Sequence, residues 1–340
     1  MKADFDIHEG TYLLYPTRKD VWRKDAGPIA DVVLNLSALL SRYEKTTLGV
    51  LPDCDKAKIR ELSVGADVID MLYNDIWIRD SGAVPVGDHL VKFGFNAWGG
   101  EDGLYSDWSQ DSTVPNQMSE HLKKPLEYSE LILEGGNLLS NGRGTLIAIK
   151  KTICNSNRNP CIDEKEAEVL LKRALGVRKI IWLDEGLVYD ETGGHVDNIC
   201  AFADEHTVFL AWTDDPGNVQ YQIVRSAFDL LCDATDADGK KFRIIKIPLP
   251  NIFKRTKDDC IGLELRSGSK ERAVEEPIQP SYINFIFANK AVIVPSFDCP
   301  TDSEVKALFE EIFPDRDVIQ FAAREIVLGG GGLHCITKNY

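Results

Sequence analysis

The last residues of the chain place one cysteine directly after a run of glycines. Glycine occupies positions 329–332, and Leu333, His334 and Cys335 follow. Because glycine has no Cβ atom, the backbone can turn sharply there and a ligand can approach it closely. A cysteine thiolate is a strong nucleophile when its surroundings activate it. We therefore expect Cys335 at the mouth of a pocket, and the chemistry depends on the residues that would activate it.

Two acidic residues elsewhere in the chain also lie beside turn-forming residues. Asp80 belongs to WIRDSG at 77–82, and Glu134 follows the apolar run 131–133 and precedes two glycines. An aspartate before Ser-Gly is also a common turn or cap residue. A glutamate at a turn is often solvated, and a buried one needs a partner. Each motif alone is ambiguous, and its value lies in the combination with the others.

A histidine and a third acid occur together in ETGGHVDN at 191–198. If this stretch is a strand, His195 and Asp197 point to the same side, because alternate residues of a strand share a face. Of the six histidines, His195 alone combines an adjacent glycine pair with a carboxylate at this spacing. By the same reasoning, His334 faces away from Cys335 if the tail is extended.

Together the motifs supply a thiol, an imidazole and three carboxylates, each expected at the end of a strand. A cysteine protease relies on backbone donors and has no use for several acids around its nucleophile. A metal site would need a close ligand set with supporting hydrogen bonds, which the spacing does not indicate. Several carboxylates around a thiol suit a planar cation with many N–H donors, and a guanidinium is such a group.

Composition excludes several other classes of function. The formal net charge is −15, which disfavours nucleic acid as a partner, because phosphate is bound by Lys and Arg. No apolar run approaches the roughly 20 residues of a membrane span, and the first residues do not form a secretory signal. Eight cysteines without a CxxC pair indicate neither a zinc ribbon nor a thioredoxin motif. We expect a cytoplasmic protein with reduced thiols. The sequence does not determine the oligomeric state, and a homo-oligomer is one of the possibilities.

The elements that must position these residues follow a recurring order of strand, helix and strand. Apolar spacing and turn residues predict helices at 28–40, 55–62, 164–175, 220–231 and 302–313, and strands at 11–16, 46–51, 67–72, 150–154, 179–183, 207–212, 242–247, 282–287, 291–294 and 318–321. The order returns every 60 to 70 residues or so, which suggests a repeated α/β module. No linker divides the chain, so we expect one domain, 1–340. The quiet stretches 99–124 and 258–280 are expected to be either lids or plain surface insertions.

Seven motifs together resemble the agmatine deiminase family of guanidino-group modifying enzymes: WIRDSG at 77–82, FNAWGG at 95–100, EGGN at 134–137, NRNP at 157–160, ETGGHVDN at 191–198, SYINF at 281–285 and GGGGLHCIT at 329–337. The resemblance runs from His8 to the C-terminus. It implies a pseudo-fivefold α/β propeller of repeated ββαβ modules. It also implies hydrolysis of agmatine to N-carbamoylputrescine and ammonia, a step of putrescine biosynthesis, with a small cationic guanidino substrate.

The resemblance also implies a role for each catalytic residue. Cys335 would attack the guanidinium carbon and form a covalent amidino intermediate. Asp80 and Asp197 would hold the guanidinium nitrogens. Glu134 would orient His195, which would protonate the departing ammonia and then activate water. No metal and no organic cofactor are implied.

Three further residues are expected to bind substrate. Trp77 and Trp98 would form walls of the pocket, either stacking on the guanidinium or covering the alkyl chain, although tryptophans are as often plain core. Glu191 would meet the distal ammonium of agmatine.

The chain departs from the family pattern outside the five catalytic residues. The stretch after EGG is different, the family's arginine near position 277 is missing, and Ala83 stands for a proline. Gly332 and the final Lys338-Asn339-Tyr340 differ as well. The sequence therefore does not determine which group the protein recognises at the far end of the substrate. The alternatives are a deiminase for free or peptide-linked arginine, an amidinotransferase with an amine acceptor, and an inactive guanidine-binding relative.

Overall fold

The computed structural model describes residues 1–340, except for the side chain of residue 102, and within them the strands form five larger sheets and one small one. The larger sheets are β18-β1-β2-β3 (Lys338–Asn339, Thr11–Leu14, Thr46–Val50, Asp67–Asp70), β4-β5-β6 (Val84–Val86, His89–Gly94, Leu126–Ile132), β7-β8-β9 (Leu139–Ser140, Thr145–Ile149, Lys179–Leu183), β10-β11-β12 (Cys200–Phe202, Thr207–Trp212, Arg243–Pro248) and β15-β16-β17 (Ile286–Ala288, Ala291–Ser296, Asp317–Ala322). The small sheet pairs β13 (Phe253–Lys254) with β14 (Pro277–Ile278).

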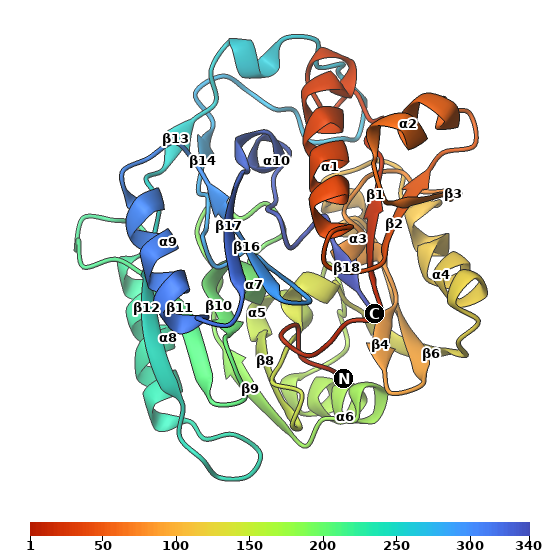
Figure 1. Ribbon diagram of the computed structural model, residues 1–340. Coiled ribbons are helices and arrows are strands. Elements are labelled where there is room, and N and C mark those ends of the chain that lie inside the picture. The colour runs from red at the N-terminus through yellow and green to blue at the C-terminus, as the bar shows by residue number, and fades with distance from the viewer.

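Each larger sheet contains the same connection pattern, and the first sheet has in addition the strand β3, which is parallel to β2 and joined to it through a further helix. An antiparallel pair is followed by a parallel pair whose strands are joined through a helix. The joining helices, drawn at the periphery of Figure 1, are α1 (Gly27–Leu40), α4 (Val114–Leu122), α6 (Glu164–Leu175), α8 (Tyr221–Asp233) and α9 (Thr301–Ile312). The chain thus repeats a ββαβ unit, and the fold is a mixed α/β fold.

Five shorter helices and five 3₁₀ turns complete the described elements. The helices are α2 (Lys56–Leu62), α3 (Ile78–Ser81), α5 (Lys150–Ile153), α7 (Val196–Ile199) and α10 (Arg324–Leu328). The 3₁₀ turns are η1 (Lys24–Ala26), η2 (Gly100–Asp102), η3 (Asp111–Thr113), η4 (Gly135–Asn137) and η5 (Asp258–Cys260). None of the helices in the described part of the chain has the length and apolarity of a membrane span.

Helix α6 shows how the sequence sets these elements. The side chain of Asp163 accepts a hydrogen bond from the backbone N–H of Glu166 at 2.9 Å and caps the first turn. Gly176, at φ 66°, ends the helix in the left-handed region. Apolar residues at helical spacing, among them Leu171, face inward and are buried. These local signals agree with one another, and the bounds predicted for this helix are confirmed.

The two ends of the chain meet in the first sheet. β18 pairs antiparallel with β1, with Thr11 opposite Asn339 and Tyr12 opposite Lys338. The rings of Tyr12 and Tyr340 lie 5.1 Å apart, and both side chains are buried. Because β18 begins three residues after Cys335, this pairing fixes the position of the cysteine from the C-terminal side.

Four sequence predictions fail, each for a local reason. Residues 150–154 form helix α5 rather than a strand, and the strand is the fully buried Thr145–Ile149. Residues 282–285 form a loop, and β15 covers only Ile286–Ala288. The stretch 99–124 contains α4, and the β4-β5-β6 unit was not predicted, because its strands are short and mixed in polarity. The recurring strand–helix–strand order itself is confirmed.

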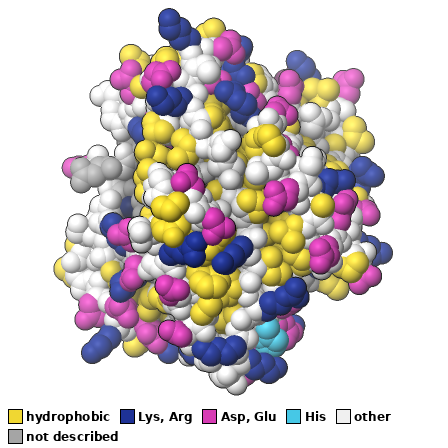
Figure 2. Space-filling model, turned by 90° about the vertical axis from the view of Figure 1, so that its left-hand side faces the viewer, with side chains coloured by type: hydrophobic (Ala, Val, Ile, Leu, Met, Phe, Trp, Pro, Cys, Tyr) yellow, Lys and Arg dark blue, Asp and Glu magenta, His cyan; other side chains and the backbone are white. Residues whose placement is uncertain are grey.

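The surface carries both signs of charge. Figure 2 shows Lys and Arg side chains interspersed with Asp and Glu on the face that it presents. Many of the acids pair with bases, as Lys151 does with Glu185 at 2.9 Å. Such exposed pairs contribute little to stability but keep the surface solvated.

Replacement of Tyr340 by alanine tests the closing contact of the chain. We expect Tyr340→Ala to lower the free energy of unfolding by about 3 to 5 kcal/mol, because the buried ring leaves a cavity against Tyr12. Denaturant unfolding measures the change. Tyr128→Ala is the control, since that side chain is 68% exposed and its loss should change stability by less than about 0.5 kcal/mol. Equal effects of the two substitutions would contradict a structural role for the β18 segment.

Candidate active site

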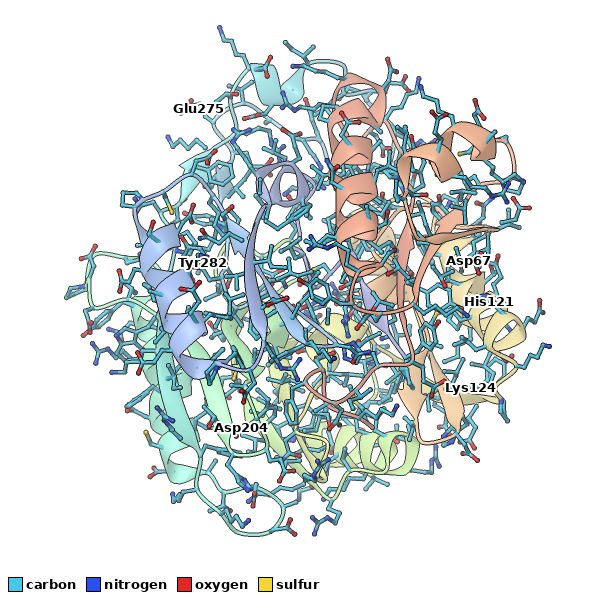
Figure 3. All side chains as sticks on the ribbon, in the orientation of Figure 1. Asp67, His121, Lys124, Asp204, Glu275 and Tyr282 are labelled. Carbon is cyan, nitrogen blue, oxygen red and sulfur yellow. The ribbon has the colours of Figure 1, made fainter. Side chains whose placement is uncertain are left out.

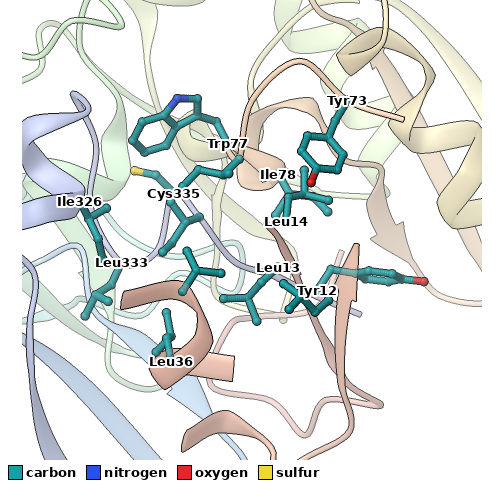
Figure 4. Packing of buried hydrophobic residues seen from close by; sticks show 14 of the residues in the cluster. Tyr12, Leu13, Leu14, Leu36, Tyr73, Trp77, Ile78, Ile326, Leu333 and Cys335 are labelled. Carbon is teal, nitrogen blue, oxygen red and sulfur yellow. The ribbon is translucent and has the colours of Figure 1, made fainter. Parts of the chain in front are cut away.

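Cys335 lies in a turn between α10 and β18, and its side chain is buried. Figure 4 shows it beside the ring of Trp77, above the apolar residues Leu333 and Ile326. The glycines before it are required by close packing. A Cβ atom at Gly331 would approach the Trp77 ring to 2.5 Å, and Gly330 has a φ of 104° that side chains rarely adopt. The glycine run therefore lets the backbone pass directly under the tryptophan.

Two carboxylates face the same space as the cysteine. Asp80, on α3, accepts hydrogen bonds from the Trp98 indole N–H at 2.9 Å and from the Gly136 backbone N–H at 2.8 Å. Asp197, on α7, has its Oδ2 atom 3.7 Å from the Cys335 sulfur, and its Oδ1 atom has no hydrogen-bond partner among the described residues. Both carboxylates are buried. A buried carboxylate oxygen without a partner suits a ligand that donates N–H groups.

His195 lies between two of the acids. Its Nε2 atom is 3.5 Å from Oε2 of Glu134, and its Nδ1 atom is 3.7 Å from Oδ1 of Asp80. Glu134 is in turn held by the Nε–H of Arg158, which donates to its Oε1 at 2.9 Å. The side chains of His195 and Glu134 are fully buried. The imidazole therefore has carboxylates on two sides and a fixed place against Glu134.

This charge arrangement sets the protonation of the histidine. Burial alone would lower the pKa of His195, but the negative charges of Asp80 and Glu134 outweigh it and raise that pKa to about 9. At neutral pH the imidazole is therefore a cation. Burial would likewise raise the pKa of Glu134, but His195 and Arg158 lower it below its ordinary value. The pair is an imidazolium next to a carboxylate.

Without a bound cation, the surroundings of Cys335 favour the neutral thiol over the thiolate. Burial raises the pKa of the Cys335 thiol well above its ordinary value, and the negative charges of Asp197 and Asp80 raise it further. The pKa of Asp80 is also raised, mainly by burial. A cation bound between these two acids would reverse their effect on the sulfur.

Gly136 forms the floor of the site. A Cβ atom on this residue would lie 2.6 Å from Nδ1 of His195, 2.8 Å from Oδ1 of Asp80 and 3.1 Å from Oδ2 of Asp197. Three of the reactive side chains thus converge on one position that lacks a side chain. The second glycine of EGGN is required for steric reasons, and not for a special backbone angle.

The structure brings the five expected catalytic residues together, but through different local geometry. His195 and Asp197 do not share a strand face; His195 precedes the short helix α7, which carries Asp197. The tail at Cys335 is not extended, and His334 does not simply point away. Its Nδ1 atom is 2.8 Å from Oδ2 of Asp197, and the prediction that His334 faces away from Cys335 does not apply, because it was made for an extended tail. Four-residue helices leave no periodicity from which the sequence could have shown this.

The expected substrate-binding residues have defined places. Trp77 packs over Gly331, and Trp98 hydrogen-bonds Asp80 from a turn in which its φ is 63°. Such backbone angles are costly for a bulky residue and are often found at functional sites. Glu191 lines a hollow together with Gly330–Gly332. Its Oε1 atom pairs with Arg272 at 2.7 Å and with Lys270 at 2.9 Å.

Sequence reasoning missed the residues that support the catalytic ones. Arg158 holds Glu134, and Asn284 contacts the sulfur of Cys335; both occur in the motifs NRNP and SYINF without an assigned role. Asp4 lies 3.3 Å from Nε2 of His334 and 3.2 Å from Nη1 of Arg79. Asp4 had no signal in the sequence, because its partners are more than 70 residues away along the chain.

The donors do not form a metal site. Among the residues that the structure describes, no group of three or more His, Cys, Asp or Glu side chains is arranged to hold a metal ion. The arrangement can bind a planar cation between Asp80 and Asp197, present a thiol to it and supply a proton from His195.

Comparison with known proteins decides the family. The model of the family described as Porphyromonas-type peptidyl-arginine deiminase matches residues 1–340. The chain belongs to this family. The chain is similar to proteins named agmatine deiminase over nearly its full length. The one from Pseudomonas fluorescens (strain SBW25) is 37% identical and the one from Pseudomonas aeruginosa (strain LESB58) is 36% identical. Each alignment covers 99% of this chain and 94% of the relative.

A solved structure agrees with the family assignment. The agmatine deiminase of Enterococcus faecalis, described as catalysing its reaction, superposes with a TM-score of 0.95 at 28% identity, over 100% of this chain and 94% of that one. The α/β architecture described above is therefore the fold of this deiminase family, over the full length of the chain.

Replacement of Gly136 by alanine tests the convergence of the site. We expect Gly136→Ala to lower kcat at least about a hundredfold. The new methyl group must displace His195 or Asp80, and a shift of even about 1 Å in a group that contacts the substrate strongly slows a reaction. Ammonia release from a guanidino substrate measures the loss. Gly27→Ala is the control, because nothing lies within 4 Å of a Cβ there. A fully active Gly136→Ala enzyme would show that these side chains do not act together.

Proposed function

We propose that this chain is an agmatine deiminase, which converts agmatine and water to N-carbamoylputrescine and ammonia. The observation that carries the proposal is the buried cluster of Cys335, His195, Glu134, Asp80 and Asp197. Full-length similarity to proteins named agmatine deiminase supports the choice of substrate. The substrate is a small cation, which fits the two buried carboxylates of Asp80 and Asp197 that face the same space as Cys335.

The first half of the reaction follows from the positions of the groups. The guanidinium binds with its N–H groups on Asp80 and Asp197, and its charge lowers the pKa of the Cys335 thiol, whose proton passes to solvent. The thiolate sulfur attacks the guanidinium carbon, so a C–S bond forms while a C=N electron pair moves onto nitrogen. Protonated His195 gives its proton to a terminal nitrogen, the C–N bond breaks and ammonia departs. An amidino group then remains on the sulfur.

The second half uses the same histidine as a base. Neutral His195 takes a proton from water, and the water oxygen attacks the amidino carbon. The C–S bond then breaks, the sulfur leaves as thiolate and the carbonyl of the product forms. The second proton of the water passes to the sulfur and restores the thiol, and the ammonia released in the first half takes up, in solvent, the proton that the thiol lost. Glu134 keeps the imidazole in place through both steps.

We further propose that Glu191 binds the distal ammonium of agmatine. Its Oε2 atom is buried without a hydrogen-bond partner among the described residues, and it lies next to Gly330 in the hollow beside Asn284. Burial would raise the pKa of Glu191, but Arg272 and Lys270 lower it, so the group is a carboxylate. Trp77 and Trp98 would form the walls of the channel between the two ends.

The same neighbourhood favours arginine as the second candidate substrate. Arg272 is buried and donates to Glu191 and to the carbonyl of Gly329, so a guanidinium lies directly against Glu191. A cation there suits the α-carboxylate of free arginine. Peptide-linked arginine would bring a polypeptide to a cysteine that is only 4% exposed.

We also propose that the five ββαβ units form a single catalytic domain, 1–340, arranged as a pseudo-fivefold α/β propeller, in which β18 completes the unit that β1 and β2 begin. The shared connection pattern of the five sheets supports this arrangement. Eight free cysteines suit a reducing compartment, and we place the enzyme in the cytoplasm.

Ammonia release with a panel of guanidines tests the function. We expect the purified, reduced enzyme to hydrolyse agmatine with a kcat/KM at least about a hundredfold above that for arginine or an arginyl peptide, and Cys335→Ala to be inactive. Glu191→Gln should raise KM for agmatine and change kcat less, since it touches only the distal end. Mass spectrometry of the product distinguishes hydrolysis, which gives N-carbamoylputrescine, from transfer of the amidino group to an amine. No turnover of agmatine by intact enzyme would reject the proposal, and a preference for arginine would favour the second candidate.

The pH dependence follows from the histidine. We expect kcat/KM for agmatine to fall above about pH 9, because His195 loses the proton that it must donate. Glu134 is one of the groups that raise this pKa. Glu134→Gln should therefore shift the alkaline limb of the pH profile, the fall of kcat/KM at high pH, to lower pH. Glu205→Gln, which removes an exposed acid paired with Arg143, is the control and should leave the limb in place. An unchanged limb in folded Glu134→Gln enzyme would mean that His195 is not the acid.

A further inference from the structure

Asn284 reaches the catalytic cysteine from a loop. A strand was predicted at 282–287, but residues 281–285 form an irregular turn before β15. The Ser281 hydroxyl donates to the carbonyl of Asn198 at 2.7 Å, and Tyr282 extends to the start of α9, where its hydroxyl lies 2.8 Å from that of Thr301 (Figure 3). The loop is thus held at two points, and Asn284 between them is buried.

The amide of Asn284 has a fixed orientation at the sulfur. Its Oδ1 atom accepts the backbone N–H of His334 at 2.8 Å, and a backbone N–H can only donate, so the oxygen is on that side. Its Nδ2 atom is then 3.3 Å from the sulfur of Cys335 and 3.0 Å from Oδ1 of Asn198. The carbonyl of Asp197 is a third acceptor, 3.2 Å from Nδ2, so the two amide hydrogens are shared among three acceptors, one of which is the sulfur.

The surroundings of the sulfur otherwise oppose a negative charge. Burial, Asp197 and Asp80 raise the pKa of the Cys335 thiol, whereas the Asn284 amide and the backbone at Gly332 lower it. A hydrogen bond donated to a thiolate is stronger than one donated to a thiol, because the acceptor is charged. The contact therefore favours the ionised form of the nucleophile.

Gly332 makes room for this amide. A Cβ atom at position 332 would clash with Oδ1 of Asn284. Position 332 is also one at which the chain departs from the tail expected for the family. The last glycine of the run thus has a specific use: it permits Asn284 to lie against the turn that carries Cys335.

We propose that Asn284 is a catalytic residue, whose amide N–H donates a hydrogen bond to the sulfur of Cys335 and stabilises the thiolate that attacks the substrate. The attack itself rests on the deiminase function proposed above, whereas the effect of the amide on the thiol does not. Asn284 acts on the thiolate before the C–S bond forms and again when the sulfur leaves.

Alkylation of Cys335 tests this role without any turnover. Iodoacetamide reacts with the thiolate, and peptide mass spectrometry follows Cys335 separately from the other seven cysteines. We expect Asn284→Ala to slow alkylation about tenfold at each pH below the pKa of the thiol, because losing the donor raises that pKa by about one unit. Asn284→Asp keeps the acceptor for His334 but adds a negative charge, and should be slower still. Gly332→Ala should slow alkylation with Asn284 still present.

The matched control is Asn141→Ala. Asn141 is also a buried amide, with Nδ2 donating to the carbonyl of Glu205 at 3.1 Å and Oδ1 accepting the N–H of Thr145 at 3.0 Å, but neither of these hydrogen bonds involves the sulfur. Its removal should lower stability and leave alkylation of Cys335 unchanged. Wild-type alkylation rates in folded Asn284→Ala protein, or a wild-type Cys335 that stays unmodified at every pH, would overturn the proposal. If alkylation responds as expected and agmatine is not hydrolysed, only the proposed function fails.

Discussion

Mutual compensation of buried charge is the constraint on which the rest of this structure depends. Asp80, Glu134, Asp197 and His195 are all withdrawn from water. An isolated buried carboxylate is very costly, so each must have donors held in place by the fold. Glu134 has Arg158 and His195, Asp80 has Trp98 and the Gly136 N–H, and Asp197 has His334. The low dielectric that makes these partners necessary also strengthens their effect on a bound cation.

The donors come from segments far apart along the chain, which explains why the ends of the chain matter. His334 lies between Asp197 and Asp4, so the N-terminal segment contacts a histidine adjacent to the nucleophile. Burial would lower the pKa of His334, but the two carboxylates raise it. With β18 paired to β1 just beyond, the turn that carries Cys335 is held from both termini. A site built in this way is lost when either end is displaced.

The sequence singled out residues that the fold brings together, but it did not show which residues support them. Glu134 and His195 have adjacent glycines and Cys335 follows a glycine run by three residues, and close approach of the backbone is a local property that a sequence displays. Arg158 and Asn284 have no such signal, because an arginine or asparagine in a turn is ordinary until its partner is known. Helix α6 was predicted because capping, apolar spacing and a terminal glycine agree. Helices α3 and α7, with four residues each, are set by tertiary contacts and were not.

A structure of Cys335→Ala protein with agmatine bound tests the central claim most directly, namely that the buried acids exist to place a guanidinium against residue 335. We predict that the guanidinium nitrogens lie within hydrogen-bond distance of Asp80 and Asp197, with the carbon facing position 335 and the ammonium at Glu191. A guanidinium bound at Glu191 instead, or an agmatine that leaves Asp80 and Asp197 without contact, would contradict it.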